Sequence, residues 1–282
     1  MINNEDNYGD CSVVISSCDT RNDIWHPFFT LFFRYWPDCP FPIYLISSYK
    51  KYNDPRVKTI SVGKDKGWAT NMKMALKQIP TLYVLAMLDD LFLEKNTNTN
   101  YIKSLVNHAQ NNSIGYIGLV PFFDIDKDYT DAFNLGKISK SVDRISHRAS
   151  LWDKKVLSSL LVDGENVIQM EIEGSKRSHS ITAPFLSVKE PVMYYHVRSA
   201  IIRGKWMYDA VKLCRKEGIK LDFDKRPIDY EWKWKQVFDD FRKTILIRKL
   251  AHVPIIGKIL SLFFRYLFSL KINKIFNNLF KK

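Results

Sequence analysis

The chain has 282 residues, of which 46% are hydrophobic and 26% are charged, and its formal net charge is +13. This composition excludes a disordered chain, and the length allows a full buried core in one large domain with an appendage. The positive charge calls for an anionic partner, which could be nucleic acid, a membrane surface or a phosphorylated substrate.

The four cysteines show neither a paired spacing nor an accompanying histidine cluster; they are Cys11, Cys18, Cys39 and Cys214. This usage is typical of reduced, packed thiols in a cytosolic protein. The N-terminus has no basic region followed by an apolar one, so no secretory signal is expected. No run of about 20 apolar residues predicts a transmembrane helix.

Strand and helix patterns alternate through the first half of the chain. The apolar runs predict strands at residues 12–17, 42–48, 57–62, 83–88 and 114–120, and the amphipathic spacing predicts helices at 25–35, 68–79 and 101–110. Such alternation predicts an α/β fold with a parallel sheet covered on both faces.

The second half is less regular. Residues 121–148 show no dominant period and predict a flexible, substrate-facing loop. Its aspartates at 124, 126, 128 and 131 are interleaved with aromatic residues, but the glycine and glutamate of a calcium loop are missing. We expect helices at 151–161 and 204–217, a polar acidic cluster at 164–178, and a strand at 192–196.

Two adjacent carboxylates, Asp89 and Asp90, follow the apolar strand at 83–88 directly. Placing them side by side at the end of a buried strand costs several kcal/mol unless a positive charge meets them. A divalent cation at the carboxyl edge of a parallel sheet is one solution, and a plain turn or a helix cap is the alternative.

The last 41 residues hold ten lysines and arginines and no acidic residue, which accounts for ten of the thirteen net positive charges. Between residues 255 and 270 the polar side chains form one narrow stripe on an apolar helix. Such a helix is about 24 Å long at 1.5 Å per residue, and it suits the membrane interface better than a span. The alternative is a helix packed on the body or in an oligomer. Nucleic acid is disfavoured because binding to phosphates does not need a broad apolar face.

Several short segments, in this order, resemble those of bacterial GT-A-type glycosyltransferases from surface-polysaccharide gene clusters, such as those for O-antigen and capsule. The segments are residues 13–19, 35–40, 67–68, 88–93 and 171–177, so the likeness covers roughly residues 11–220 and leaves the tail out. The resemblance implies a GT-A-like, Rossmann-like and mostly parallel sheet flanked by helices, with a catalytic domain at 1–230 and a basic amphipathic helical tail at 231–282.

The resemblance also implies Mn²⁺ or Mg²⁺ bound to the pyrophosphate of a nucleotide sugar. Asp89 and Asp90 match the family's Asp-x-Asp element, and Asp89 is also expected to contact the nucleotide sugar. Leu91 stands where a further carboxylate is often found, which leaves the ligand set short. His196 is similar to a C-terminal histidine that completes such sites, although a lone histidine in this position could equally be structural.

Six residues fall where the family contacts its nucleotide: Ser17, Asp19, Asp65, Gly67, Trp68 and Asn71. Gly67 at a helix start would let backbone N–H groups approach a phosphate. Asp65 could accept a hydrogen bond from a uracil or thymine N–H, and Trp68 could stack on the base or only anchor its helix. Arg148 and Arg177 could neutralise the pyrophosphate or pair with nearby acids.

Inverting members of the family use one carboxylate as the general base on the acceptor hydroxyl. Glu171 resembles that residue and Glu173 is its nearest rival. On a strand the two side chains would share a face, whereas on a helix they would diverge and only one could serve.

Together these patterns predict a metal-dependent, inverting glycosyltransferase. It would use a UDP- or dTDP-sugar and a lipid-linked or glycan acceptor, without nucleic acid. Its tail would hold it on the anionic inner face of the bacterial plasma membrane, so that it is cytoplasmic and peripheral. A sugar nucleotidyltransferase is an alternative, but it should carry a Gly-rich basic loop after the first strand, and residues 16–19 lack such a loop. A non-catalytic membrane or nucleic-acid adaptor would leave the buried carboxylates unexplained.

Overall fold

The computed structural model describes residues 10–121, 123–130, 133–140, 144–195 and 199–230. The chain divides into two compact units, residues 1–228 and 229–282. The expected amphipathic tail at 231–282 lies outside the described residues, so its helix and its role stay predictions. Within the described ranges, every helix falls short of the length and hydrophobicity needed to cross a membrane.

A nine-stranded sheet forms the centre of the first unit, in the order β3-β2-β1-β4-β8-β5-β9-β7-β6. Its strands are β1 Cys11–Ser16, β2 Ile43–Ser47, β3 Val57–Ser61, β4 Tyr83–Leu88, β5 Tyr116–Gly118, β6 Ile125–Thr130, β7 Leu135–Ile138, β8 Ser150–Asp153 and β9 Phe185–Val188. The first four run parallel to one another, and β8 enters antiparallel between β4 and β5. The α/β fold with its Rossmann-like parallel half is therefore confirmed.

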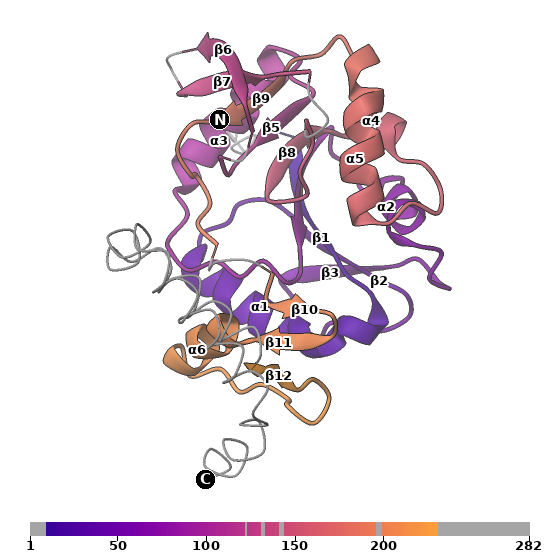
Figure 1. The fold of residues 1–282 in the computed structure, drawn as a ribbon, viewed down its shortest axis with the longest axis vertical. Coiled ribbons are helices and arrows are strands. Elements are labelled where there is room, and N and C mark those ends of the chain that lie inside the picture. The colour runs from indigo at the N-terminus through magenta and orange to yellow at the C-terminus, as the bar shows by residue number, and fades with distance from the viewer. Residues whose placement is uncertain (1–9, 122, 131–132, 141–143, 196–198, 231–282) are drawn as a thin grey trace, which may run out of the picture. The chain divides into compact units, whose positions relative to one another are not determined.

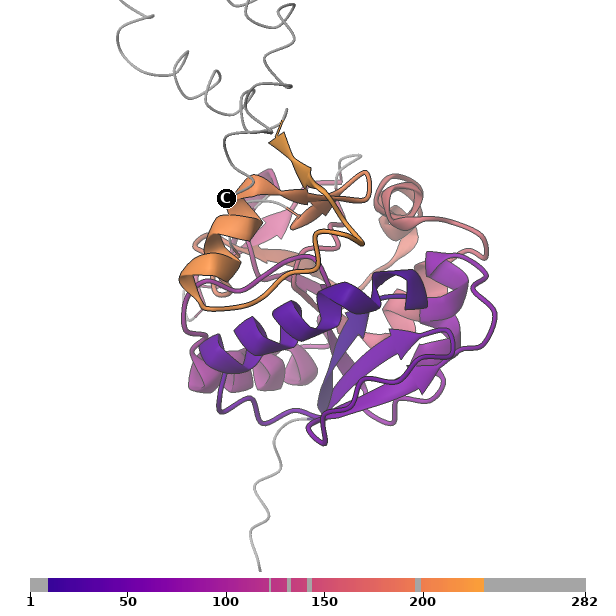
Figure 2. The same ribbon diagram turned by 90° about the horizontal axis from the view of Figure 1, so that it is seen from below.

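Helices cover both faces of this sheet (Figures 1 and 2). They are α1 Asn22–Tyr35, α2 Trp68–Leu76, α3 Thr99–Asn111, α4 Lys154–Leu160 and α5 Val167–Arg177. Helices α2, α4 and α5 lie together on one face, where Met72, Leu157 and Met170 share a core with Val14 of β1. Because side chains alternate along a strand, Val13 and Ile15 point to the opposite face, on the side of α1 and α3.

A smaller three-stranded sheet, in the order β10-β11-β12, follows the main one. Its strands are β10 Ile201–Ile202, β11 Lys205–Met207 and β12 Ile228–Asp229, with α6 Tyr208–Lys216 after β11. The helix expected at 204–217 therefore begins four residues later, because its first residues pair as a strand.

All four cysteines are free thiols.

Three further expectations for the second half are wrong. Residues 121–148 contain a hairpin, β6 and β7, whose register shifts twice and so hides the two-residue period. Residues 150–153 form β8 rather than the start of a helix, and α4 begins after Asp153, which caps it. Residues 192–195 form only an isolated bridge between Tyr195 and Leu93, whereas β9 was not predicted.

Candidate active site

The two predicted carboxylates lie at the carboxyl end of β4, where the parallel register brings the end of β1 beside them. Leu88 pairs with Ser16, and the hydroxyl of the next residue, Ser17, donates a hydrogen bond to Asp89 Oδ2. Trp25 Nε1 donates to the same hydroxyl at 2.6 Å and fixes its orientation. Asp89 and Asp90 are only 2% and 7% exposed, so their charges require compensation.

Arg21 supplies the positive charge. Its Nε and Nη2 atoms lie 2.9 and 2.6 Å from Asp89 Oδ1, and Nη2 lies 2.9 Å from Asp90 Oδ2. Burial lowers the pKa of Arg21, but the charges of the two carboxylates outweigh it and raise that pKa above its usual range. Burial and the charge of Asp89 raise the pKa of Asp90 to about 6, although Arg21 acts in the opposite direction.

This arrangement bears on the expected Mn²⁺ or Mg²⁺. Both oxygens of Asp89 already accept hydrogen bonds from Arg21 or Ser17. Of the four oxygens of the two carboxylates, only Asp90 Oδ1 is buried without a partner among the described residues. His196, the expected third ligand, lies outside the described residues. Among the residues that are described, no group of three or more His, Cys, Asp or Glu side chains could hold a metal. As they are arranged, these side chains do not form a divalent-cation site, because Arg21 takes the position of the cation.

The loop before α2 is organised by two of the predicted nucleotide contacts. Asp65 Oδ1 accepts from the backbone N–H of Gly67 at 2.9 Å and from Asn71 Nδ2 at 2.8 Å, while Lys66 N–H donates to Asn71 Oδ1. Gly67 adopts φ +92°, which favours glycine. Asp65 is exposed, and its Oδ2 makes no hydrogen bond within the described part of the chain, so it remains available to a ligand.

Asp19 is engaged differently. Its carboxylate accepts the backbone N–H groups of Ser48, Tyr49 and Lys50, all at 3.0–3.3 Å. It thus closes the turn after β2 onto the end of β1. The amino end of α2 is also occupied, because Ala69 N–H donates to the carbonyl of Glu165. These contacts organise the edge of the sheet, and a direct nucleotide contact by Asp19 or Gly67 stays a prediction.

Trp68, the first residue of α2, packs against His147 with ring centroids 4.2 Å apart and the ring planes tilted by 58°. His147 is 4% exposed, and burial lowers the pKa of its imidazole to about 3, so the ring is neutral near pH 7. Neither Trp68 Nε1 nor His147 Nε2 has a hydrogen-bond partner among the described residues. The Trp68–His147 pair joins the start of α2 to the cavity described next.

A cavity of about 440 Å³ lies beside the carboxylates, and Leu88 and Leu91 on either side of them line it together with His147, Arg148, Glu171 and Tyr195. This volume is within the range of about 300–1,000 Å³ that is usual for ligand sites. Glu171 Oε1 accepts the backbone N–H of His147 at 2.7 Å, which fixes one oxygen of this carboxylate. The predicted base, Glu171, therefore lines the same cavity as Leu88 and Leu91, which flank the two buried carboxylates.

Residues 167–177 are helical, which decides between the two predicted arrangements of Glu171 and Glu173. Glu173 turns away from the cavity and pairs with Lys176 at 2.8 Å in an exposed position. The helix begins at a capping box, in which Asn166 and Gln169 each accept the other's backbone N–H. This capping signal is present in the sequence and could have predicted the divergence.

The two predicted arginines lie in different environments. Arg148 is exposed and lines the cavity. Arg177 donates to the carbonyl of Leu160 and binds both oxygens of Glu165, so it fastens the end of α5 to the preceding loop. Sequence reasoning did not identify Arg21 or His147; a basic residue in the turn after the first strand was the one available signal for Arg21.

No family model matches the chain, and no curated protein matches it. Solved structures do show similarity: a mannosyltransferase, PcManGT from Pyrobaculum calidifontis in complex with GDP-Man and Mn²⁺, at 10% identity and a TM-score of 0.49. TarS 1-349 from S. aureus in complex with UDP-GlcNAc is similar at 10% identity and a TM-score of 0.46. HddC from Yersinia pseudotuberculosis is similar at 14% identity and a TM-score of 0.45.

These matches cover 70–73% of this chain, 58% of the mannosyltransferase, 64% of TarS 1-349 and 99% of HddC. The chain thus spans less than two thirds of the first two structures. At such identities and TM-scores below 0.5, none of the similarities assigns an activity to this chain.

Proposed function

We propose that the protein is a nucleotide-sugar-dependent glycosyltransferase with a GT-A-like fold. One observation carries the proposal: a helix-borne carboxylate, Glu171, shares a cavity of about 440 Å³ with the residues that flank the acidic end of β4. The carboxyl edge of the parallel strands is where open α/β sheets bind nucleotides. A carboxylate held opposite that edge is suited to removing a proton from an acceptor.

The donor nucleotide would lie over the loop at residues 65–71. Asp65 is oriented through Oδ1 and offers Oδ2 to the ring N–H of uracil or thymine, which favours a UDP- or dTDP-sugar. Trp68 would present its ring near the base, and Ser17 would contact the donor from the end of β1. Arg148, exposed at the cavity, would bind the pyrophosphate.

The chemical step follows from this placement. The acceptor hydroxyl gives its proton to the carboxylate of Glu171 as its oxygen attacks the anomeric carbon of the donor sugar. The bond from that carbon to the diphosphate oxygen breaks, and the nucleoside diphosphate leaves on the opposite side. Attack opposite the leaving group inverts the anomeric configuration.

The expected Mn²⁺ or Mg²⁺ remains a prediction on Asp89, Asp90 and His196, and no step above depends on it. Tyr195 bridges to Leu93, and Ala200 N–H donates to the carbonyl of Asp90 at 2.6 Å, while His196 lies outside the described residues. Arg21 would have to release the carboxylates before they could bind a metal.

We also propose the cellular setting. Residues 242–282 contain ten basic residues and no acidic one, and the sequence of 255–270 predicts a helix with a broad apolar face. Both features support binding of the tail at 231–282 to an anionic membrane. Residues 1–230 would then be the catalytic domain. A lipid-linked acceptor of bacterial surface-polysaccharide synthesis, such as O-antigen or capsule, would be reached on the inner face of the plasma membrane.

Thermal denaturation of the full chain with UDP, dTDP, GDP, ADP and CMP tests the donor assignment, each in the presence of EDTA and of Mn²⁺. Uracil or thymine diphosphates should raise the midpoint in at least one of these conditions, and more than GDP or ADP does. If none of the five nucleotides changes the midpoint in either condition, the proposal is wrong.

A further inference from the structure

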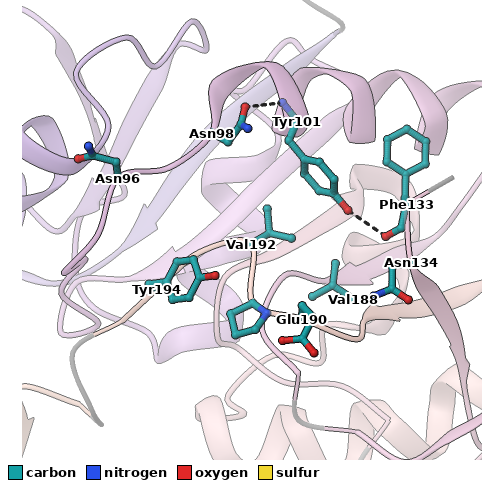
Figure 3. Close-up of a pocket in the computed structure, with 10 residues that line it drawn as sticks. Asn96, Asn98, Tyr101, Phe133, Asn134, Val188, Glu190, Val192 and Tyr194 are labelled. Carbon is teal, nitrogen blue, oxygen red and sulfur yellow. Dashed lines mark hydrogen bonds between the residues drawn. The ribbon is translucent and has the colours of Figure 1, made fainter. Parts of the chain in front are cut away.

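A second hollow of about 270 Å³ adjoins the cavity, and we call it the side pocket. It lies between the start of α3, the β6–β7 turn and the segment after β9, as Figure 3 shows. Pro191 and Tyr194 line both the side pocket and the cavity that contains Glu171. The two hollows therefore meet at these two residues, and we take them as neighbouring parts of one binding site.

The polar lining of the side pocket is made of amides and one carboxylate: Asn96, Asn98, Asn134 and Glu190 (Figure 3). Asn98 Oδ1 accepts the N–H of Tyr101 at 3.0 Å, while the side chains of the other three make no hydrogen bond with any described residue. An amide both donates and accepts, and a carboxylate accepts, which together match the hydroxyl groups of a sugar.

The charge of the lining disfavours anionic ligands. Although the chain has a net charge of +13, none of the described residues that line the side pocket is lysine or arginine, and Glu190 adds a negative charge. The nearby Lys95 is outside the lining, with its Nζ held 4.5 Å from the centroid of the Tyr194 ring. Glu190 in the lining therefore disfavours a phosphate, a uronic acid or the pyrophosphate of a lipid carrier. It does not disfavour a neutral hexose or N-acetylhexosamine.

Aromatic side chains complete the lining and are held in place before any ligand arrives. Tyr101 Oη donates a hydrogen bond to the carbonyl of Phe133 at 2.9 Å (Figure 3). The ring centroids of Phe133 and His108 lie 4.8 Å apart. These contacts pin the β6–β7 turn to α3. Asn134 follows at φ +48°, a conformation that asparagine tolerates better than most residues. Aromatic rings attract the polarised C–H edges of sugars through their negative faces.

We propose that the side pocket binds a neutral sugar residue of the acceptor, next to the sugar whose hydroxyl Glu171 deprotonates. This inference rests on the proposed function, because it takes the cavity as the reaction site. It adds that the acceptor is a glycan of at least two sugars whose second residue carries no charge.

Saturation-transfer NMR on the full chain tests the assignment with maltose, lactose and N,N′-diacetylchitobiose as neutral probes, and glucuronic acid and glucose 6-phosphate as anionic ones. Asn134→Gly removes the amide and keeps the positive φ accessible, and Glu190→Ala removes the carboxylate. Asn100→Ala, an exposed change on α3 outside both hollows, is the control.

At least one neutral disaccharide should bind, with its affinity lowered about fivefold to tenfold by each pocket variant and unchanged by Asn100→Ala. The two anionic sugars should bind at least about tenfold more weakly than that disaccharide. The inference is overturned if no neutral probe binds, if both pocket variants bind as the wild type does, or if the anionic probes bind equally well. Nucleotide stabilisation without neutral-sugar binding would reject the side pocket alone, and sugar binding without nucleotide stabilisation would reject the proposed transferase.

Discussion

Arg21 and Asp89 form a bidentate ion pair across the ends of β1 and β4, with Nη2 of the arginine 2.6 Å from Oδ1 of the aspartate. The same nitrogen reaches Asp90 at 2.9 Å. The guanidinium is thus the cation that two adjacent buried carboxylates require, and it comes from a turn 68 residues earlier in the chain.

Replacement of Arg21 should therefore be costly. Arg21→Gln leaves two adjacent carboxylates buried with no positive charge beside them, which should lower the free energy of unfolding by about 3–5 kcal/mol. Lys176→Gln is a matched control, since its pair with Glu173 is exposed on both sides and its loss should cost at most about 1 kcal/mol. Urea denaturation of both variants measures the difference, and equal losses would show that the buried pair has no special role.

The response to metal should depend on Arg21. With the guanidinium present, Mn²⁺ alone should leave the thermal midpoint of the protein unchanged. Arg21→Ala frees oxygens of both carboxylates, so Mn²⁺ should stabilise this variant by up to about 2.7 kcal/mol at a hundredfold excess over its Kd. Adding Asp90→Asn to Arg21→Ala should abolish the effect. A large Mn²⁺ stabilisation of the wild type would contradict the blocking role of Arg21, because the predicted site on Asp89, Asp90 and His196 would then bind metal without its replacement.

His147 should make stability depend on pH. Its folded pKa of about 3 lies below the ordinary value of 6.5, so between these values the unfolded state binds more protons. Its contribution is fully present above pH 6.5 and is lost as the pH falls toward 3, by at most about 1.4 kcal/mol per pH unit. Asp90, with its pKa raised to about 6, acts with the opposite sign between its ordinary value and pH 6.

Comparison of the wild type with His147→Gln isolates the histidine from Asp90. The difference in unfolding free energy between the two proteins should shrink as the pH falls from 6.5 to 4. Denaturation series at several pH values measure it, and a constant difference would mean that His147 is not held neutral by the fold.

Asp65 should contribute to nucleotide affinity. In Asp65→Asn, an amide N–H can replace the oxygen that would accept the base N–H, and the charged acceptor is lost. The affinity for UDP should fall about tenfold to a hundredfold, as measured by calorimetry. Asp163→Asn, an exposed acidic side chain paired with Lys73, should leave UDP affinity unchanged. Equal affinities in wild type and Asp65→Asn would place the base elsewhere.

The sequence predicted best where one apolar pattern covers the whole element. The apolar run at 83–88 matches β4 residue for residue, because a strand buried on both faces needs no alternation. The hairpin β6–β7 was missed because its register shifts interrupt the alternation around Asp126 and Asp128. The residues of strand β8 were predicted to be helical, because four residues are too few to distinguish the two-residue period of a strand from the 3.6-residue period of a helix.

The site was predictable in type but not in pairing. The need of Asp89–Asp90 for a positive charge followed from burial alone, whereas its identification as Arg21 depends on the tertiary packing of β1 beside β4. The choice of Glu171 over Glu173 depends on helical geometry, in which residues two apart diverge by about 200°. His147 gave no signal, since its burial comes from contacts with Trp68 and α5 that are distant in sequence.

The general-base role of Glu171 is the central claim, and transfer of radiolabelled sugar from the best-binding nucleotide sugar to a membrane extract or glycan acceptor tests it most directly. Glu171→Gln retains an oxygen for the His147 N–H but cannot take a proton, so turnover should fall at least about a hundredfold with nucleotide affinity unchanged. Glu173→Gln removes one exposed ion pair and should retain most of the activity. Full turnover in Glu171→Gln, or a loss confined to Glu173→Gln, would contradict the assignment.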